Sequence, residues 1–250
     1  MSGKLIKFFG ILLVLQTSFA TLLFLGTSGK NPKDHAVFGM ILGLIILWVF
    51  VGGWLMKTFK DSIRTLILKI PLRWGTKFVL FCTFLALVEE AIATAMTNTA
   101  PWYGLKIGEA FITVSSNYFQ VVLGNSVIIF IPAFIALAIL LKRYNFSPNQ
   151  IFLTFGIMGT CLEVVLAGPQ HFLEIGMWMF IYGLMVYLPA YSLPERPNLK
   201  PVRFYHFILP FLLYPLCLIL FIPVIAGIKL AIPNIDYRFP AFEQQLNQSK

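Results

Sequence analysis

The chain has 250 residues, of which 58% are hydrophobic and only 12% charged, and its formal net charge is +9 at pH 7. This composition is far more apolar than that of a soluble domain and indicates that lipid is the solvent. The basic residues gather at the ends of apolar segments rather than in a stripe with exposed aromatic residues, which excludes nucleic acid as an expected partner. We therefore expect an all-α, polytopic membrane helix bundle that forms a single integral membrane domain over residues 1–250.

Seven apolar segments are candidates to span the bilayer. In chain order they are residues 5–25, 36–56, 78–96, 126–141, 151–167, 173–191 and 207–230. The first contains a sequence similar to a signal-peptidase site, Ser18-Phe19-Ala20, but its apolar run continues to Leu25, so a retained helix is favoured over a cleaved one. Prolines inside the fourth and seventh segments predict kinked or broken helices.

A basic stretch separates the second and third segments. Within residues 57–76, lysines and arginines alternate with apolar residues at helical spacing. This pattern predicts an amphipathic helix that lies at the headgroup level on the cytoplasmic side and bends near Pro71. Its basic side chains are expected to contact anionic lipid headgroups.

The distribution of lysine and arginine predicts an orientation. The connections 57–77, 142–143 and 196–203 are basic, whereas the alternating connections carry little net charge. The positive-inside rule then places the N-terminus in the cytoplasm. We expect the membrane to be the plasma (inner) membrane. On the outer side, the aromatic and nearly uncharged residues 97–125 are either a loop or a re-entrant segment, and residues 234–250 form a polar C-terminal tail.

Three glutamates lie inside the apolar segments. Glu89 and Glu90 are in the third segment and Glu163 is in the fifth. An acidic group at the centre of a membrane helix costs about 2.5 to 3.5 kcal/mol on insertion scales, so an intramembrane glutamate is by default a functional candidate. Both helices run outward, and each glutamate is about 18 to 20 Å from the inner end at 1.5 Å per residue. We expect the three carboxyl groups to share one level in the outer half of the membrane.

Helical geometry also predicts which polar residues share a face. Glu90 lies on one stripe with three threonines, whereas Glu89 points about 100° away. Glu163 begins a comparable stripe that leads to His171 and Glu174. We predict that Glu90, Glu163 and Glu89 form the catalytic group, and that the binding residues are His171, Glu174, Asn98 and Asn117.

Three functions remain open for such a site. The favoured one is a membrane-embedded enzyme that acts on a lipid or isoprenoid-like substrate by acid–base chemistry. The alternatives are a proton- or cation-coupled transporter of small molecules and a structural protein whose glutamates only hold helices together. The chain has no H-E-x-x-H or E-x-x-H motif, so we predict neither a metal site nor a cofactor.

Overall fold

The computed structural model describes residues 2–27, 31–196 and 198–232 of the chain. This part is all-α and has no β-strand beyond an isolated bridge between Tyr144 and Lys200. Seven of its helical segments are long and apolar enough to cross a membrane, which confirms the predicted helix bundle: Ser2–Gly26, Pro32–Lys69, Trp74–Tyr103, Tyr118–Leu141, Pro148–Ala167, Pro169–Tyr191 and Phe204–Ala231. The chain is a multi-pass integral membrane protein. The predicted tail 234–250 lies outside the described residues.

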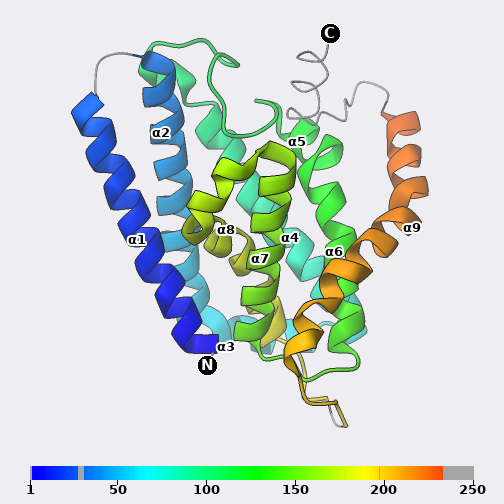
Figure 1. The fold of residues 1–250 in the computed structure, drawn as a ribbon. Helices are drawn as coiled ribbons and strands as arrows, with labels where there is room; N and C mark the ends of the chain where they lie inside the picture. The colour runs from blue at the N-terminus through cyan, green and yellow to red at the C-terminus, as the bar shows by residue number, and fades with distance from the viewer. Residues whose placement is uncertain (1, 28–30, 197, 233–250) are drawn as a thin grey trace.

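The individual elements follow the chain in the order drawn in Figure 1. The long helices are α1 (Ser2–Thr27), α2 (Pro32–Leu44), α3 (Gly53–Lys69), α4 (Trp74–Thr97), α6 (Ser126–Leu141), α7 (Pro148–Ala167), α8 (Ile175–Tyr191) and α9 (Leu209–Ala231). A π-helical stretch, Ile45–Gly52, joins α2 to α3, and α5 (Tyr118–Gly124) is short. Three 3-10 helices complete the fold: Ala100–Tyr103, Pro169–Glu174 and Phe204–Phe207.

Several helices begin at residues whose side chains satisfy the first free backbone N–H groups. Before α7, the hydroxyl of Ser147 accepts a hydrogen bond from the N–H of Gln150, and the Gln150 side chain accepts one from the N–H of Ser147. The side chains of Asn31 and Asn117 likewise accept hydrogen bonds from first-turn N–H groups of α2 and α5. Such caps matter at membrane boundaries because an unsatisfied backbone group in lipid is costly.

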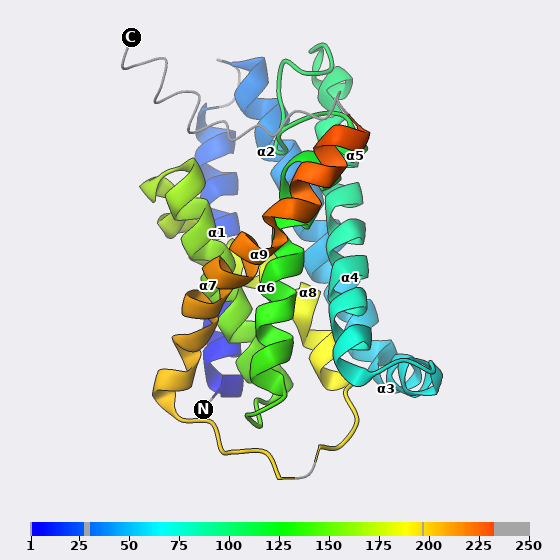
Figure 2. The same cartoon turned by 90° about the vertical axis from the view of Figure 1, so that its right-hand side faces the viewer.

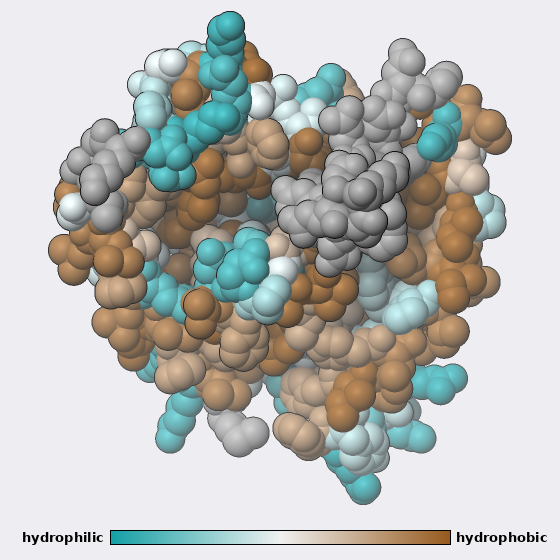
Figure 3. Space-filling model, turned by 45° about the horizontal axis from the view of Figure 1, so that its top comes forward, coloured by the Kyte–Doolittle hydropathy of each residue, from teal (hydrophilic) through white to brown (hydrophobic). Residues whose placement is uncertain are grey.

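Helix α8 lies at the centre of the bundle. It packs against α1, α3, α4 and α7, while α4 also packs against α2 and α6. Helices α1 and α9 are on opposite sides of the bundle, and few of their residues are buried inside the protein (Figure 1). On the face drawn in Figure 3, most of the surface is apolar, and hydrophilic side chains gather at the top and bottom of the view and in one patch between them. This surface fits a molecule surrounded by lipid on its flanks.

Helix α3 crosses one end of the bundle instead of continuing the direction of α2 (Figure 2). The ammonium group of Lys77, at the start of α4, donates hydrogen bonds to the carbonyl oxygens of Ile67 and Ile70 at 3.1 and 3.2 Å. Because the last carbonyls of a helix have no partner within it, Lys77 closes the C-terminal end of α3. The hydroxyl of Tyr191, in α8, donates a 2.5 Å hydrogen bond to Asp61 of α3.

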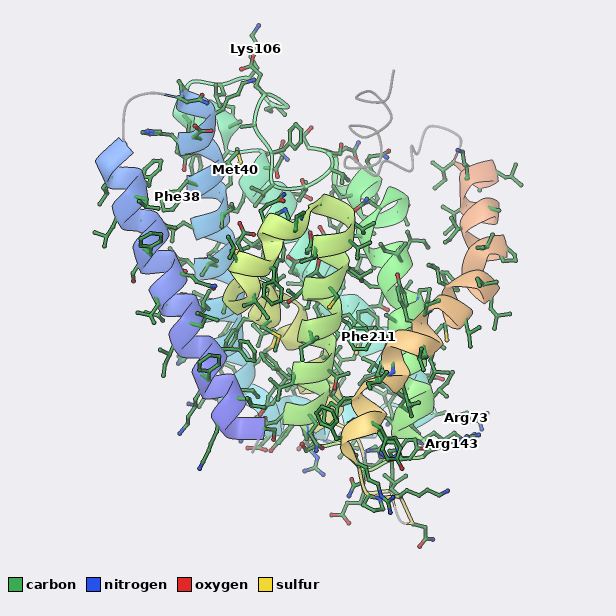
Figure 4. All side chains as sticks on the ribbon, viewed as in Figure 1. Phe38, Met40, Arg73, Lys106, Arg143 and Phe211 are labelled. Atoms are coloured by element: carbon green, nitrogen blue, oxygen red, sulfur yellow. The ribbon has the colours of Figure 1, made fainter. Side chains whose placement is uncertain are left out.

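Basic residues are concentrated at the end that α3 crosses. This end, called the basic end below, also carries the start of α1 and the connections 142–147, 192–196 and 198–203 (Figures 1 and 2). Arg73 and Arg143 lie there, whereas Lys106 lies at the opposite end (Figure 4). The opposite end is covered by residues 97–117, where the hydroxyl groups of Thr97 and Thr113 are 3.0 Å apart.

Candidate functional site

The three intramembrane glutamates lie within electrostatic range of one another. Glu89 and Glu90 lie in the second half of α4 with exposed fractions of only 5% and 7%, and Glu163 lies half-buried in the second half of α7. The carboxyl groups of Glu89 and Glu90 each interact electrostatically with that of Glu163. Glu89 takes part in this group although it is offset from Glu90 around the helix.

Tyr182 of α8 joins the glutamates of the two other helices. Its hydroxyl group donates a hydrogen bond to Glu163, and it also interacts electrostatically with Glu89 and Glu90. The ring fits there because Gly159 of α7 faces it, and a Cβ atom at that position would overlap the ring. Close packing of α7 on α8 therefore sets the position of the phenol beside the carboxyl groups.

The first turn of α6 contributes a hydroxyl group. Ser126 is buried, and its side chain lies within hydrogen-bonding reach of the Glu90 carboxyl group and, at 3.2 Å, of the carbonyl oxygen of Val121. The chain breaks its helix at Asn125, between α5 and α6, so Ser126 starts a new helix beside α4. The glutamates are thus surrounded by polar groups from four helices: α4, α6, α7 and α8.

Toward the opposite end from the basic end, the polar groups continue to the surface. His171 Nδ1 is 2.9 Å from Glu174 Oε2, and the indole N–H of Trp178 donates to the same oxygen at 3.1 Å. Both His171 and Glu174 interact electrostatically with Glu163. Their side chains are 23% and 44% exposed. The residues Glu89, Glu90, Tyr182, Glu163, His171 and Glu174, called the acidic cluster below, therefore extend from a buried interior to a partly exposed edge.

The two predicted asparagines have partners in the backbone. The amide of Asn98 donates to the carbonyl oxygens of Thr94 at 3.0 Å and Ser116 at 2.9 Å. The amide oxygen of Asn117 accepts from the N–H groups of Phe119 and Gln120. The structure thus places both side chains at helix ends, where they satisfy backbone groups of the outer segment.

Two members of the site were absent from the predicted set. Tyr182 follows Glu174 and Trp178 at steps of four residues, so the sequence already placed it on one face with them. Ser126 is the polar residue at the start of an otherwise apolar segment. The sequence, however, does not indicate that α6 lies beside Glu90.

The arrangement is suited to holding and passing protons. Neighbouring carboxyl groups in a low-dielectric surrounding disfavour each other's ionisation, and a phenol or a histidine can donate to one of them. Within the described ranges, no group of three or more His, Cys, Asp or Glu residues is placed to hold a metal ion. Comparison of the chain with protein-family models, curated proteins and solved structures finds no match. Function is therefore argued from the geometry of the acidic cluster.

Proposed function

We propose that the acidic cluster is an intramembrane acid–base site and that the protein is an enzyme acting on a lipid-like substrate. The observation that supports this most is that the carboxyl groups of the cluster lie in different environments. Glu163 is half-buried and hydrogen-bonded to Tyr182, whereas its electrostatic partners Glu89 and Glu90 are fully enclosed. Carboxyl groups held in different environments can take the separate roles of acid and base.

A substrate could reach Glu163 from the bilayer. One turn further along the same face of α7, Leu166 and Ala167 are exposed, and the exposed fraction of Leu166 is 38%. Because this surface is apolar, lipid chains and not water are expected to cover it. An apolar substrate dissolved in the membrane would therefore meet the half-exposed edge of Glu163 without crossing a polar barrier.

The expected chemistry is proton transfer to and from such a substrate. Glu163, in contact with the Tyr182 hydroxyl group, would give a proton to the substrate or take one from it. Glu90, supported by Ser126, would do the opposite, with Glu89 limiting how much negative charge the pair can hold. His171 and Glu174 would exchange protons between Glu163 and water at the exposed edge.

Proton-coupled transport is the second candidate, and it is favoured because the acidic cluster extends from the partly exposed edge to the buried interior. Titratable groups that interact electrostatically follow one another from the partly exposed His171 and Glu174, through Glu163, to the enclosed Glu89 and Glu90. Such a line is also what a transporter needs in order to load protons in the middle of the membrane.

One pair of variants tests both candidates. Glu163→Gln keeps the shape of the side chain but removes its exchangeable acid, and Glu195→Gln is the control because Glu195 is an exposed acid in the basic-end connection. Purified protein in liposomes of native lipid extract would be assayed by mass spectrometry of the lipids and by a pH-sensitive dye inside the vesicles. We expect Glu163→Gln, but not the control, to abolish turnover of a lipid species.

The remaining outcomes have equally definite meanings. Loss of proton movement with an unchanged lipid profile would replace the enzyme with a transporter. If Glu163→Gln changed neither reading and only lowered the melting temperature, the cluster would be structural and both functional candidates would be wrong.

A further inference from the structure

Helix α1 carries a large polar side chain in the middle of its apolar length. Gln16 lies near the centre of the 26 residues of α1 and is half-buried, whereas its neighbours Val14 and Leu15 are exposed. An amide group in hydrocarbon is costly unless it forms hydrogen bonds. The partners of Gln16 therefore show what this helix, of which few residues are buried, is held against.

Both partners of Gln16 are backbone groups at the start of α8. The amide nitrogen of Gln16 donates to the carbonyl oxygen of Leu173 at 2.5 Å, and its amide oxygen accepts from the N–H of Gly176 at 3.1 Å. These two hydrogen bonds are called the Gln16 clip below. Because Glu174 lies between Leu173 and Gly176, the clip holds the backbone on both sides of this member of the acidic cluster.

Helix α8 needs a cap from outside because its own N-cap residue does not supply one. Glu174 occupies the N-cap position, but its side chain makes no hydrogen bond to the first N–H groups of the helix. Its carboxylate oxygen instead contacts His171 and Trp178. The first N–H groups of a helix have no partner within the helix, and lipid offers none. Gln16 of α1 therefore supplies the cap that Glu174 does not.

The packing of α1 on α8 is close at the clip. Gly176 is buried, and a Cβ atom there would overlap the amide oxygen of Gln16 and lie 2.7 Å from the backbone nitrogen of Leu13. Leu13, one helical turn before Gln16, is only 2% exposed. Apolar packing and hydrogen bonding thus fix the same register between the two helices.

We propose that Gln16 is a positioning residue of the acidic cluster, because it fixes the backbone on both sides of Glu174. The carboxylate of Glu174 then stays beside His171 and Trp178. From there it interacts electrostatically with Glu163. Helix α1 is on this view a part of the site and not only an anchor in lipid. The effect of Gln16 on activity rests on the proposed function, whereas its effect on the position of Glu174 does not.

Two variants of α1 test the clip. Gln16→Leu removes the amide group and keeps an apolar side chain of similar size, so neither hydrogen bond can form. Thr21→Val is the matched control on the same helix, because the Thr21 hydroxyl group donates to the carbonyl oxygen of Thr17, within α1 itself.

Two measurements on the purified protein do not depend on activity. Hydrogen–deuterium exchange of the Gly176 amide reports on the clip, and the indole N–H resonance of Trp178, assigned with Trp178→Phe, reports on the position of Glu174. In Gln16→Leu we expect about fivefold faster exchange at Gly176, the effect of losing one ordinary hydrogen bond. The indole resonance should move in the same variant. Neither change is expected in Thr21→Val.

A conservative variant separates hydrogen bonding from the volume of the side chain. At pH 5 the carboxyl group of Gln16→Glu is protonated in hydrocarbon, so its O–H can donate to Leu173 and its carbonyl oxygen can accept from Gly176. We expect this variant to restore both the slow exchange at Gly176 and the native indole resonance. If it behaved like Gln16→Leu, hydrogen bonds would not hold Glu174 in place and the proposal would be wrong.

The liposome assays described above then measure the effect on function. We expect Gln16→Leu to lower lipid turnover or proton movement by up to about 100-fold, the loss that a displacement of about 1 Å at a site can cause. An unchanged Trp178 resonance in Gln16→Leu would overturn the proposal, even if Gly176 exchanged faster, since the clip would then only cap α8. If the native protein showed neither turnover nor proton movement, the proposed function would fail, and exchange and resonance would still decide the role of Gln16.

Discussion

Tyr182 is the residue that connects the two halves of the acidic cluster. It comes from α8, donates its hydroxyl proton toward Glu163 and interacts with both glutamates of α4. Its ring lies 5.6 Å from that of Phe130 and 6.0 Å from that of Trp178, so aromatic packing fixes its direction. A hydroxyl group held in this way orients the carboxyl group of Glu163.

Replacement of Tyr182 by phenylalanine tests this role. Tyr182→Phe keeps the ring packing and removes only the hydroxyl group, so we expect a loss of about 1 kcal/mol in stability. The turnover or proton movement measured for the native protein should fall much further, because Glu163 loses its donor. Tyr187→Phe, a change elsewhere on α8, is the control for a general effect of removing a phenol. Unchanged function in Tyr182→Phe would show that the hydroxyl group only supports the fold.

Thr94 presents the opposite case, a buried hydroxyl group without a partner. Thr94 is 4% exposed, and its Oγ1 atom makes no hydrogen bond in the described structure. By contrast, the hydroxyl group of Thr160 donates to the carbonyl oxygen of Gly156 at 2.9 Å. We expect Thr94→Val to leave the melting temperature unchanged or higher and Thr160→Val to lower it. A lower melting temperature in Thr94→Val would reveal a partner for that hydroxyl group.

At the scale of elements, the packing of α7 on α8 determines where Tyr182 lies relative to Glu163. Gly156 and Gly159 of α7 lie against Met179 and Tyr182 of α8. A Cβ atom added to Gly156 would come within 2.8 Å of the carbonyl oxygen of Met179. Small residues allow such close approach of helix backbones in lipid, where packing replaces the hydrophobic effect as the driving force.

A methyl group at this contact should therefore disturb both fold and function. Gly159→Ala has to displace the Tyr182 ring, at a cost of about 1 to 3 kcal/mol in stability. Gly227→Ala in α9 is the matched control, because no atom lies within 4 Å of its added Cβ. We expect a lower melting temperature only for Gly159→Ala. Equal melting temperatures for both variants would contradict the close packing of α7 on α8.

The elements themselves could be predicted well where the apolar run was long. All seven predicted spans correspond to helical segments, because a run of about 20 apolar residues has few alternatives in lipid. The ends were less predictable. Helix α4 starts at Trp74, earlier than the apolar run suggested, since a polar first turn does not interrupt a helix. The fourth span starts at Tyr118 because the short helix α5 precedes the break at Asn125 and the apolar helix α6.

At the scale of the whole molecule, the basic end gives the protein a polarity. Helix α3 and the connections 142–147, 192–196 and 198–203, all of which contain lysine or arginine, lie at this end (Figures 1 and 2), and so do Arg73 and Arg143 (Figure 4). We propose that this end faces the cytoplasm, because lysine and arginine are retained on that side during insertion.

Cysteine labelling can test the orientation. The three native cysteines, Cys82, Cys161 and Cys217, would first be replaced, and Lys142→Cys and Lys106→Cys would then be made separately. A membrane-impermeant maleimide should label Lys106→Cys in intact cells and Lys142→Cys only after the membrane is opened. The reverse pattern would place the basic end outside.

The sequence by itself determined the solvent of this protein and its seven spans, and it predicted one shared depth for the three glutamates. These properties depend only on composition and on the fixed rise per residue of a helix, so they need no knowledge of neighbours. Apolar residues face both lipid and protein in such a bundle, and the hydrophobic pattern therefore does not say which helices meet. Only the tertiary structure decided that α8 lies between α4 and α7, that Tyr182 contacts Glu163, and that Asn98 and Asn117 close helix ends.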